Sequence, residues 1–180
     1  MRVIAGKFKG RKLVAPKGET RPTLDRTKET LFNILHNRLP QAIVLDLFAG
    51  SGQIGIECLS RGASRVVLCD NGRDAIVAIK HNFAQLKVQP ELFCCHFADC
   101  IRRCVGTKFD IVFVDPPYLA GLYQQVFETL EGCQSVADDG IVVCEHSAEV
   151  DLPQQFGGFC CYDTRKIGSV KFSFYQRSQS

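Results

Sequence analysis

The sequence predicts an α/β fold in which helices cover both faces of a mostly parallel, seven-stranded sheet. From Gln41 onward, short apolar runs alternate with helical stretches, as in strands joined by crossover helices. The last two apolar runs differ, because only a few residues around Lys166 and Gly168 separate them. So short a connection cannot cross the sheet, and this pair must be antiparallel. The sequence therefore predicts a parallel sheet that ends in an antiparallel hairpin.

The apolar runs and the stretches between them give the expected elements in order. The expected strands are Ile43–Phe48, Arg65–Asp70, Glu91–His96, Phe109–Val114, Gly140–Glu145, Phe159–Thr164 and Val170–Gln176. The expected helices are Gly52–Ser60, Arg73–Leu86 and Gly121–Leu130, with a short turn at Asp99–Cys104. Near-helical spacing in the second helix predicts one buried apolar stripe, formed by Ile76, Ile79, Phe83 and Leu86.

The first forty residues are expected to form an N-terminal extension of a single compact domain, whose main part is residues 41–180. They are too few to bury a core of their own. Arg2–Ala5 and Arg11–Val14 are expected to pair as a small hairpin with a basic tip.

A helix is expected to follow this hairpin, from Pro22 through Asn37. Thr23 or Asp25 would cap its start, and Pro40 would end it. Its expected buried residues are Leu31, Ile34 and Leu35.

The charge of the chain is unevenly distributed. Its net charge is +3, yet residues 1–40 hold ten Lys and Arg against three acidic residues, a net charge of +7. The remaining residues hold twelve basic and sixteen acidic side chains, a net charge of −4. A basic arm on a mildly acidic body suggests a polyanion partner.

Composition places the chain among ordinary globular proteins. It has no long apolar run and no signal-like N-terminus, so we expect a cytoplasmic protein without a membrane partner. Ten cysteines are many, but none forms a C-x-x-C pair, and we expect reduced thiols. One cluster has a spacing that fits no common zinc module, so no metal is expected there: Cys94, Cys95, His96, Cys100 and Cys104.

A glycine-rich loop follows the first expected strand and opens a helix. Gly50, Gly52 and Gly55 match G-x-G-x-x-G, and Asp70 lies twenty residues after Gly50 at the end of the next strand. This is the spacing of a nucleotide site, in which glycines let the backbone approach the ligand and the acid accepts from ribose hydroxyls. Taken alone, the pattern also fits NAD and hence an oxidoreductase.

Asp46 favours S-adenosylmethionine over NAD. It lies late in the strand, where a carboxylate can hold the cationic methionine end but would repel a pyrophosphate. Asp99, after the third strand, could accept from the adenine amino group or act as a helix N-cap. The other candidate cofactor residues lie in the loop and beside Asp70: Phe48, Ala49, Ser51 and Asn71.

The fourth expected strand runs into Asp115-Pro116-Pro117-Tyr118. Two prolines fix two φ angles and remove two backbone donors, which leaves carbonyls free to accept from a ligand. The carboxylate and the Pro116 carbonyl can take both hydrogens of a planar NH2 group, and the ring of Tyr118 can stack on its heterocycle. This tetrapeptide, assigned here as catalytic, resembles the amino-methyltransferase signature of an acid, Asn or Ser before Pro-Pro-aromatic. The predicted sheet is likewise that of the class I S-adenosylmethionine-dependent (Rossmann-like) methyltransferase fold.

Several segments together resemble one family, the RsmD-type methyltransferases of bacterial small-subunit ribosomal RNA. The resemblance spans essentially the whole chain. The segments that carry it are Arg2–Leu13, Arg21–Asn33, Leu45–Gly52, Val112–Tyr118 and Tyr175–Arg177. The Gly-Arg-Lys-Leu and Arg-Pro-Thr segments are the specific part, since many methyltransferases share the glycine loop. Asp70 departs mildly, because family members often carry Glu there.

The resemblance implies methylation of N2 of one guanine in 16S rRNA, on an assembled or assembling small subunit, by a protein expected to be monomeric. It implies that Arg21 and Thr23 lie beside the cofactor. It also places the basic hairpin on RNA, with Arg2, Lys7, Lys9, Arg11 and Lys12 as candidate contacts.

Other functions remain open at this point. The target amine could belong to adenine in DNA or to a protein glutamine, although we expect no DNA partner because no length remains for a target-recognition region. A different class is an RNA-binding assembly factor without catalysis. The complete set of Asp46, Gly50, Gly52, Asp70 and residues 115–118 argues against that loss.

Overall fold

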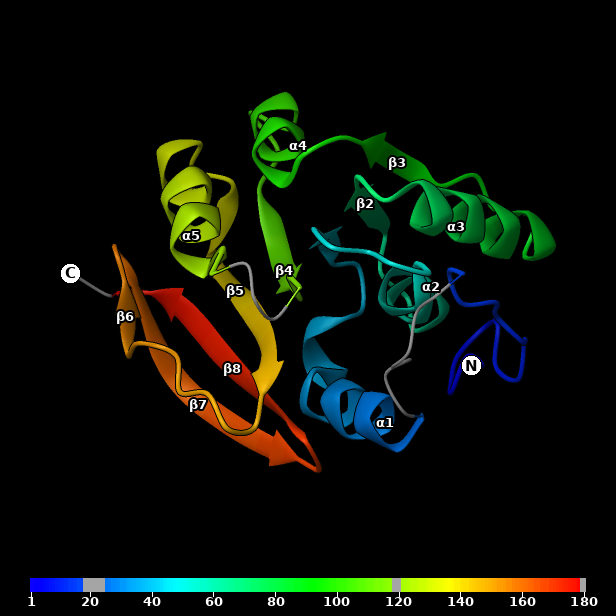
Figure 1. Cartoon of the computed structure of the whole chain (residues 1–180), viewed down its shortest axis with the longest axis horizontal. Coiled ribbons are helices and arrows are strands. Elements are labelled where there is room, and N and C mark those ends of the chain that lie inside the picture. The colour runs from blue at the N-terminus through cyan, green and yellow to red at the C-terminus, as the bar shows by residue number, and fades with distance from the viewer. Residues whose placement is uncertain (18–24, 118–120, 179–180) are drawn as a thin grey trace.

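The computed structural model of the 180-residue chain describes residues 1–17, 25–117 and 121–178. These residues form an eight-stranded sheet with the strand order β3-β2-β1-β4-β5-β8-β7-β6 (Figure 1). The strands are β1 Ile43–Asp46, β2 Arg65–Asp70, β3 Glu91–Cys94, β4 Phe109–Val114, β5 Val136–Ser147, β6 Gln155–Phe156, β7 Phe159–Ile167 and β8 Val170–Arg177.

The predicted sheet is confirmed in its main features. Strands β1 to β5 pair in parallel, and β8 is antiparallel to both β5 and β7. Several details differ from the prediction. The short strand β6 adds an eighth member, and β5 begins at Val136 rather than Gly140 and continues to Ser147. The longer β5 follows from its partners, because Val136 pairs with Phe109 on β4 and β8 pairs along it from Ile141 to Ser147. The strands β1 and β3 end two residues early, at Asp46 and Cys94, whereas β7 and β8 continue to Ile167 and Arg177.

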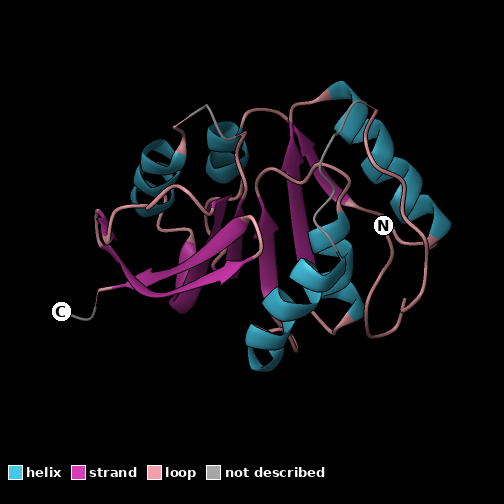
Figure 2. Ribbon diagram, turned by 60° about the horizontal axis from the view of Figure 1, so that its bottom comes forward, coloured by secondary structure: helices cyan, strands magenta, loops and turns pink. Residues whose placement is uncertain are grey.

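The helices cover both faces of the sheet (Figures 1 and 2). They are α1 Asp25–Ile34, α2 Gln53–Ser60, α3 Arg73–Gln85, α4 Phe97–Arg103 and α5 Tyr123–Gly132, with a short 3₁₀ helix at His36–Arg38. The expected turn at Asp99–Cys104 is thus the later part of α4. The alternative role of Asp99 as N-cap is wrong, because His96 occupies that position and its Nδ1 accepts from the Ala98 amide at 3.4 Å.

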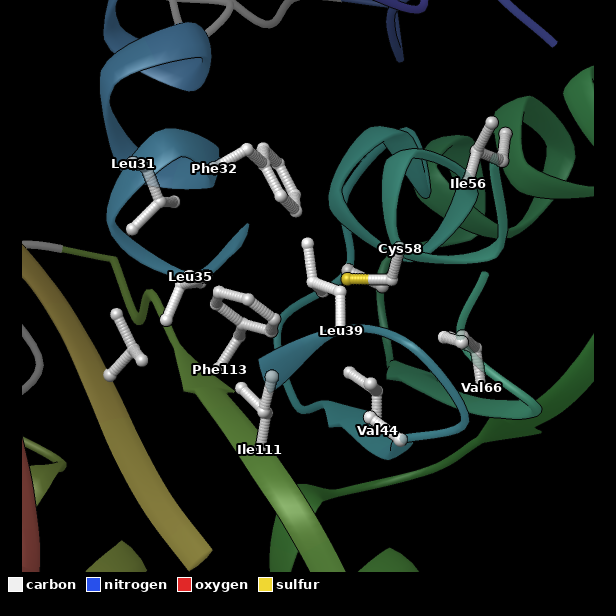
Figure 3. Packing of buried hydrophobic residues seen from close by; sticks show 14 of the residues in the cluster. Leu31, Phe32, Leu35, Leu39, Val44, Ile56, Cys58, Val66, Ile111 and Phe113 are labelled. Atoms are coloured by element: carbon white, nitrogen blue, oxygen red, sulfur yellow. The ribbon is translucent and has the colours of Figure 1, made fainter. Parts of the chain in front are cut away.

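Alternating strand residues belong to two hydrophobic clusters, one on each face. Val44, Ile111 and Phe113 pack with α1, α2 and α3 (Figure 3), whereas Leu45 and Val112 pack with α4 and α5. Both faces of the central strands are therefore buried, as in other sheets covered by crossover helices.

The buried sides of two helices differ from the expected ones. In α1, Ile34 is 41% exposed and Phe32 is fully buried in its place, as Figure 3 shows for Phe32 beside Leu31 and Leu35. The expected helix also ends its α-helical part at Ile34 instead of Asn37. In α3 the small residues Ala75 and Ala78 are buried, while Ile76 and Leu86 are only partly so. Close packing of α3 on the sheet favours small side chains at the contact.

Residues 1–17, the N-terminal arm, form a hairpin-like loop rather than two strands. One bridge joins Arg2 to Lys12, and the Val3 amide donates to the Arg11 carbonyl at 2.9 Å. Gly6 has a φ of +79°, and a Cβ there would overlap the Ser60 carbonyl oxygen. Only glycine lets the arm approach α2 this closely.

Buried polar side chains hold the arm against the domain. The Glu57 carboxylate on α2 accepts from the amides of Ile4 and Ala5 at 2.8 and 3.0 Å, and from Arg61 Nε at 2.8 Å. Lys28 on α1 has a fully buried side chain and donates to the Arg2 carbonyl at 2.7 Å. These contacts hold the arm against α1 and α2.

Candidate active site

A cavity of about 440 Å³ lies at the carboxyl ends of β1, β2, β4 and β5. In parallel sheets of this kind, ligands bind at that edge, where the loops after the strands meet. The loop residues that line it are Phe48, Ala49, Gly50, Ser51, Asn71, Cys95, His96, Phe97, Asp115, Pro116 and Pro117. The structure therefore brings Gly50 and Ser51 of the predicted glycine loop into one cavity with Asp115–Pro117 of the predicted catalytic segment, while Gly52 is not among the lining residues.

Four acidic residues line this cavity, each in or directly after the last residues of one of four strands: Asp46, Asp70, Asp115 and Glu145. Asp46 and Asp70 are the last residues of β1 and β2, and Asp115 directly follows β4. The charges of Asp115 and Asp70 raise the pKa of Asp46, and the charge of Asp115 raises the pKa of Glu145. A cationic ligand group would reduce their mutual repulsion.

Asp46 is the most deeply buried of the four acids, with 4% of its surface exposed. Burial raises the pKa of Asp46 to about 8, and the charges of Asp115 and Asp70 add to the shift. Among the described residues, Oδ2 of Asp46 has no hydrogen-bond partner. An uncompensated buried carboxylate is costly, and an ammonium group in the cavity would satisfy it. This fits the expected methionine end of S-adenosylmethionine.

Hydrogen bonds join the side chain of Asp70 to the backbone of the glycine loop. The Asp70 carboxylate accepts from the amide of Gly50 at 2.8 Å and from that of Gly72 at 2.7 Å. Asn82 on α3 donates to the Ser51 carbonyl at 2.9 Å and also bonds both backbone groups of Val14. Each Asp70 oxygen keeps a second lone pair for a hydroxyl donor. The geometry thus suits the ribose site predicted for this acid.

Two phenylalanines form an aromatic part of the lining, Phe48 after β1 and Phe97 after β3. The rings of Phe48 and Phe97 lie 5.6 Å apart between centroids, and both residues line the cavity. Asp99 lies elsewhere: it is not among the lining residues, and it pairs with Arg102 at 3.3 Å on an exposed surface. Its predicted contact with adenine has no support in this geometry.

The described part of the predicted catalytic segment, Asp115 to Pro117, lies at the rim of the cavity. Asp115 and Pro117 are exposed, and Pro116 is buried. Tyr118 lies outside the described residues, as do Arg21 and Thr23. Their predicted roles stay predictions.

A further part of the cavity lining was not predicted from the sequence. It is formed by Glu145 of β5, Leu31 of α1 and Phe172 of β8. Burial raises the pKa of Glu145 to about 8, with Asp115 adding to the shift, and the Tyr123 hydroxyl donates to the Glu145 carbonyl at 2.6 Å. An acid at the very end of an expected strand was the available signal for Glu145.

The predicted RNA contacts lie on the arm, away from the cavity. Their side chains, those of Arg2, Lys7, Lys9, Arg11 and Lys12, are all exposed. Arg2 is paired with Asp25 at 3.1 Å. Met1 connects the arm to the cavity, since its sulfur lies 3.8 Å from the hydroxyl of Ser51.

All ten cysteine thiols are free. Within residues 1–17, 25–117 and 121–178, no group of three or more His, Cys, Asp or Glu is arranged to hold a metal ion. Across the same ranges, no helix has the length and apolar character needed to cross a membrane.

Comparison with known proteins gives consistent matches along the whole chain. The family model described as "Conserved hypothetical protein 95" matches residues 1–176. "Ribosomal RNA small subunit methyltransferase D" of Escherichia coli K12 is 36% identical over 178 residues, which cover 98% of this chain and 90% of that protein.

Solved structures agree with these matches. The structure "Putative methyltransferase yhhF" from Escherichia coli has a TM-score of 0.87 and 35% identity, and the match covers 100% of this chain and 99% of that one. A hypothetical protein of Thermus thermophilus has a TM-score of 0.84 and 26% identity, with coverage of 98% and 99%.

The parallel sheet with its antiparallel hairpin and this glycine-loop cavity define a class I methyltransferase. Within that class, the chain belongs to the RsmD family.

Proposed function

We propose that this protein transfers a methyl group from S-adenosylmethionine to the exocyclic N2 amine of one guanine in bacterial 16S rRNA, on an assembled or assembling small subunit. The observation that carries the proposal is the single cavity that holds Asp46, Asp70 and the Asp115-Pro116-Pro117 rim together. A cofactor site and an acceptor site for an amine would thus be adjacent. The names of the relatives, small-subunit rRNA methyltransferases, support rRNA as the substrate class.

Several residues would hold the cofactor. Asp46 would bind its ammonium group, Asp70 its ribose, and Phe48 and Phe97 would flank its adenine. Bound there, S-adenosylmethionine supplies an electrophilic methyl group on a sulfonium. The buried carboxylates suit this cation, because its positive charge compensates their desolvation.

The rim would activate the amine. The lone pair of a guanine N2 amine is delocalised into the ring, so the group is a weak nucleophile. The Asp115 carboxylate and the Pro116 carbonyl would accept its two hydrogens and favour a pyramidal nitrogen. These acceptors would hold the nitrogen in line with the methyl group that the cofactor would supply; S-adenosylhomocysteine would be the leaving product, and the extra proton would pass to solvent. Alignment and fixed acceptors would supply most of the acceleration.

The substrate must present its base outside any helix, because the cavity cannot admit a paired nucleotide. The basic arm would hold the surrounding phosphates. Its exposed lysines and arginines lie on a segment that contacts the glycine loop through Met1 and Asn82. RNA binding and cofactor binding would therefore occur on neighbouring surfaces.

Methyl transfer to defined substrates tests the proposal. Labelled S-adenosylmethionine is supplied with small subunits lacking native modification, with naked 16S rRNA alongside, and the product nucleoside is identified after nuclease digestion. We expect N2-methylguanosine from the particle. Label on a DNA adenine or a protein glutamine would contradict the proposal, and cofactor binding with no transfer to any of these would indicate a binding-only assembly factor.

A further inference from the structure

Glu145 occupies the same place on β5 that Asp115 occupies after β4. Val114 and Cys144 are register partners in the parallel pairing of these strands, so the next residues, Asp115 and Glu145, are neighbours. Both line the cavity, and their charges interact. The two carboxyls are therefore positioned to face two adjacent groups of one ligand.

The wall beneath Glu145 is apolar and belongs to one face of the sheet. Val143 precedes Glu145 by two residues, Phe113 lies on β4, and Phe172 is the register partner of Glu145 on β8. Leu31 from α1 also lines the cavity, and Figure 3 shows Leu31 and Phe113 in the same buried cluster. All four side chains are at most 5% exposed and all line the cavity. An apolar part of the lining beside two carboxyls suits a planar base that presents hydrogen-bond donors.

We infer that Glu145 accepts a hydrogen bond from N1–H of the target guanine and so makes the site selective for guanine. The inference rests on the proposed function. On a guanine, N1–H lies directly beside the N2 amine, so an acceptor beside Asp115 faces N1–H when Asp115 takes an amine hydrogen. The Tyr123 hydroxyl, bonded to the Glu145 backbone carbonyl, holds this end of β5 in place.

Selectivity follows from the negative charge of Glu145. The raised pKa of Glu145 belongs to the empty cavity, and the positive charge of bound S-adenosylmethionine would lower it and keep the carboxyl ionised. Adenine and 2-aminopurine carry a lone pair at N1, which a carboxylate repels. A site built to accept from a substrate N–H rejects an analogue lacking that hydrogen, because its buried acceptor is then left unpaired. Glu145 would therefore read the base, whereas Asp115 would act on the reacting amine.

An analogue of the target base separates this role from a structural one. Small subunits are reconstituted from ligated 16S rRNA that carries either guanosine or 2-aminopurine riboside at the position methylated by the wild-type protein. 2-Aminopurine keeps the reacting amine but lacks N1–H. We compare kcat/KM on the two particles for the wild type, E145Q and E145D. The exposed residue Glu149, changed to Gln, is the matched control.

We expect wild type and E149Q to prefer guanosine by about a hundredfold or more. In E145Q the amide can donate to the N1 lone pair, so the preference should fall at least about tenfold. E145D keeps the charge and should still reject 2-aminopurine, although at a lower rate. Affinity for S-adenosylhomocysteine should be unchanged in all three variants.

An unchanged guanosine preference in E145Q would overturn the inference while leaving the proposed function intact. Loss of the preference in E145D as well would also overturn it, since the charge would then not be the discriminating feature. Failure of the wild type to methylate the guanosine particle would instead overturn the proposed function.

Discussion

The N-terminal arm contact and the cavity each contain a buried acid, but the two acids differ in what surrounds them. Glu57 is fully buried and accepts from two arm amides and from Arg61. Asp46 is almost as buried, yet its Oδ2 has no hydrogen-bond partner among the described residues. The comparison teaches that burial alone does not assign a role: a fully paired acid holds the fold together, whereas an acid with an oxygen unpaired among the described residues is a candidate to bind a ligand.

The same contrast extends to neighbouring groups. Around Glu57, the amide and carbonyl groups of the arm find partners in Ser60, Asn82 and Lys28. Around Asp46, the charges of two further acids, Asp70 and Asp115, raise its pKa. Such an arrangement destabilises the empty fold and gains free energy when a cation binds.

The largest expected effect tests the cavity directly. Asp115→Ala should lower methyl transfer to small subunits by at least about a hundredfold, because a fixed acceptor for the reacting amine is lost. Affinity for S-adenosylhomocysteine, measured by calorimetry, should stay near the wild-type value. Loss of cofactor binding together with transfer would contradict the role assigned to Asp115.

The next effect contrasts the two buried acids. Glu57→Gln should lower the free energy of unfolding by about 3 kcal/mol, because Arg61 loses its charge partner and an amide group faces backbone donors. Asp46→Asn should not lower it at pH 8, and should weaken cofactor binding instead. Urea denaturation and calorimetry on both variants check this contrast, which equal destabilisation would refute.

The pH dependence of that contrast has a definite sign. The pKa of Asp46 is raised from 3.8 to about 8 in the folded state, so the folded protein binds more protons than the unfolded chain across that range. Stability from this group is therefore complete below its unfolded pKa and is lost as pH rises towards about 8, by about 1 kcal/mol per pH unit. Asp46→Asn should remove this slope, leaving the similar contribution of Glu145.

Two glycines of the arm offer a matched pair of smaller effects. Gly6 and Gly10 have φ values of +79° and +83°, but a Cβ at Gly6 would overlap Ser60, whereas nothing lies within 4 Å of one at Gly10. Gly10→Ala should cost about 1 kcal/mol from backbone strain alone. Gly6→Ala should cost about 2 kcal/mol or more, because the arm must also move away from α2. Equal losses in thermal denaturation would show that the arm does not pack closely there.

The smallest effect concerns the exposed surface of the arm. The double change Arg11→Glu and Lys12→Glu should weaken binding to small subunits and flatten its salt dependence, because about two phosphate contacts are lost. The control is the double change of the exposed residues Arg102 and Arg103 on α4 to Glu. Filter binding over a range of salt concentrations checks this, and identical salt slopes for both double variants would exclude the arm as an RNA surface.

The sequence alone determined the elements whose signals are local. The apolar runs predicted β2 and β4 to the residue, and the glycine loop and the Asp-Pro-Pro rim were placed at strand ends. The alternation of side chains along a strand, a glycine turn and a pair of prolines each depend on only a few consecutive residues, so the sequence records them directly. Consequently, most cofactor candidates fell into the cavity that the structure contains.

Only the tertiary structure decided which distant residues meet. Helical spacing in α1 allowed either Phe32 or Ile34 to face the core, and packing against Phe113 and its neighbours selected Phe32. The register of β4 and β5, which places Glu145 beside Asp115, depends on long-range pairing that no local pattern records. The same holds for the arm, because Glu57 and Asn82 bond amides more than fifty residues away.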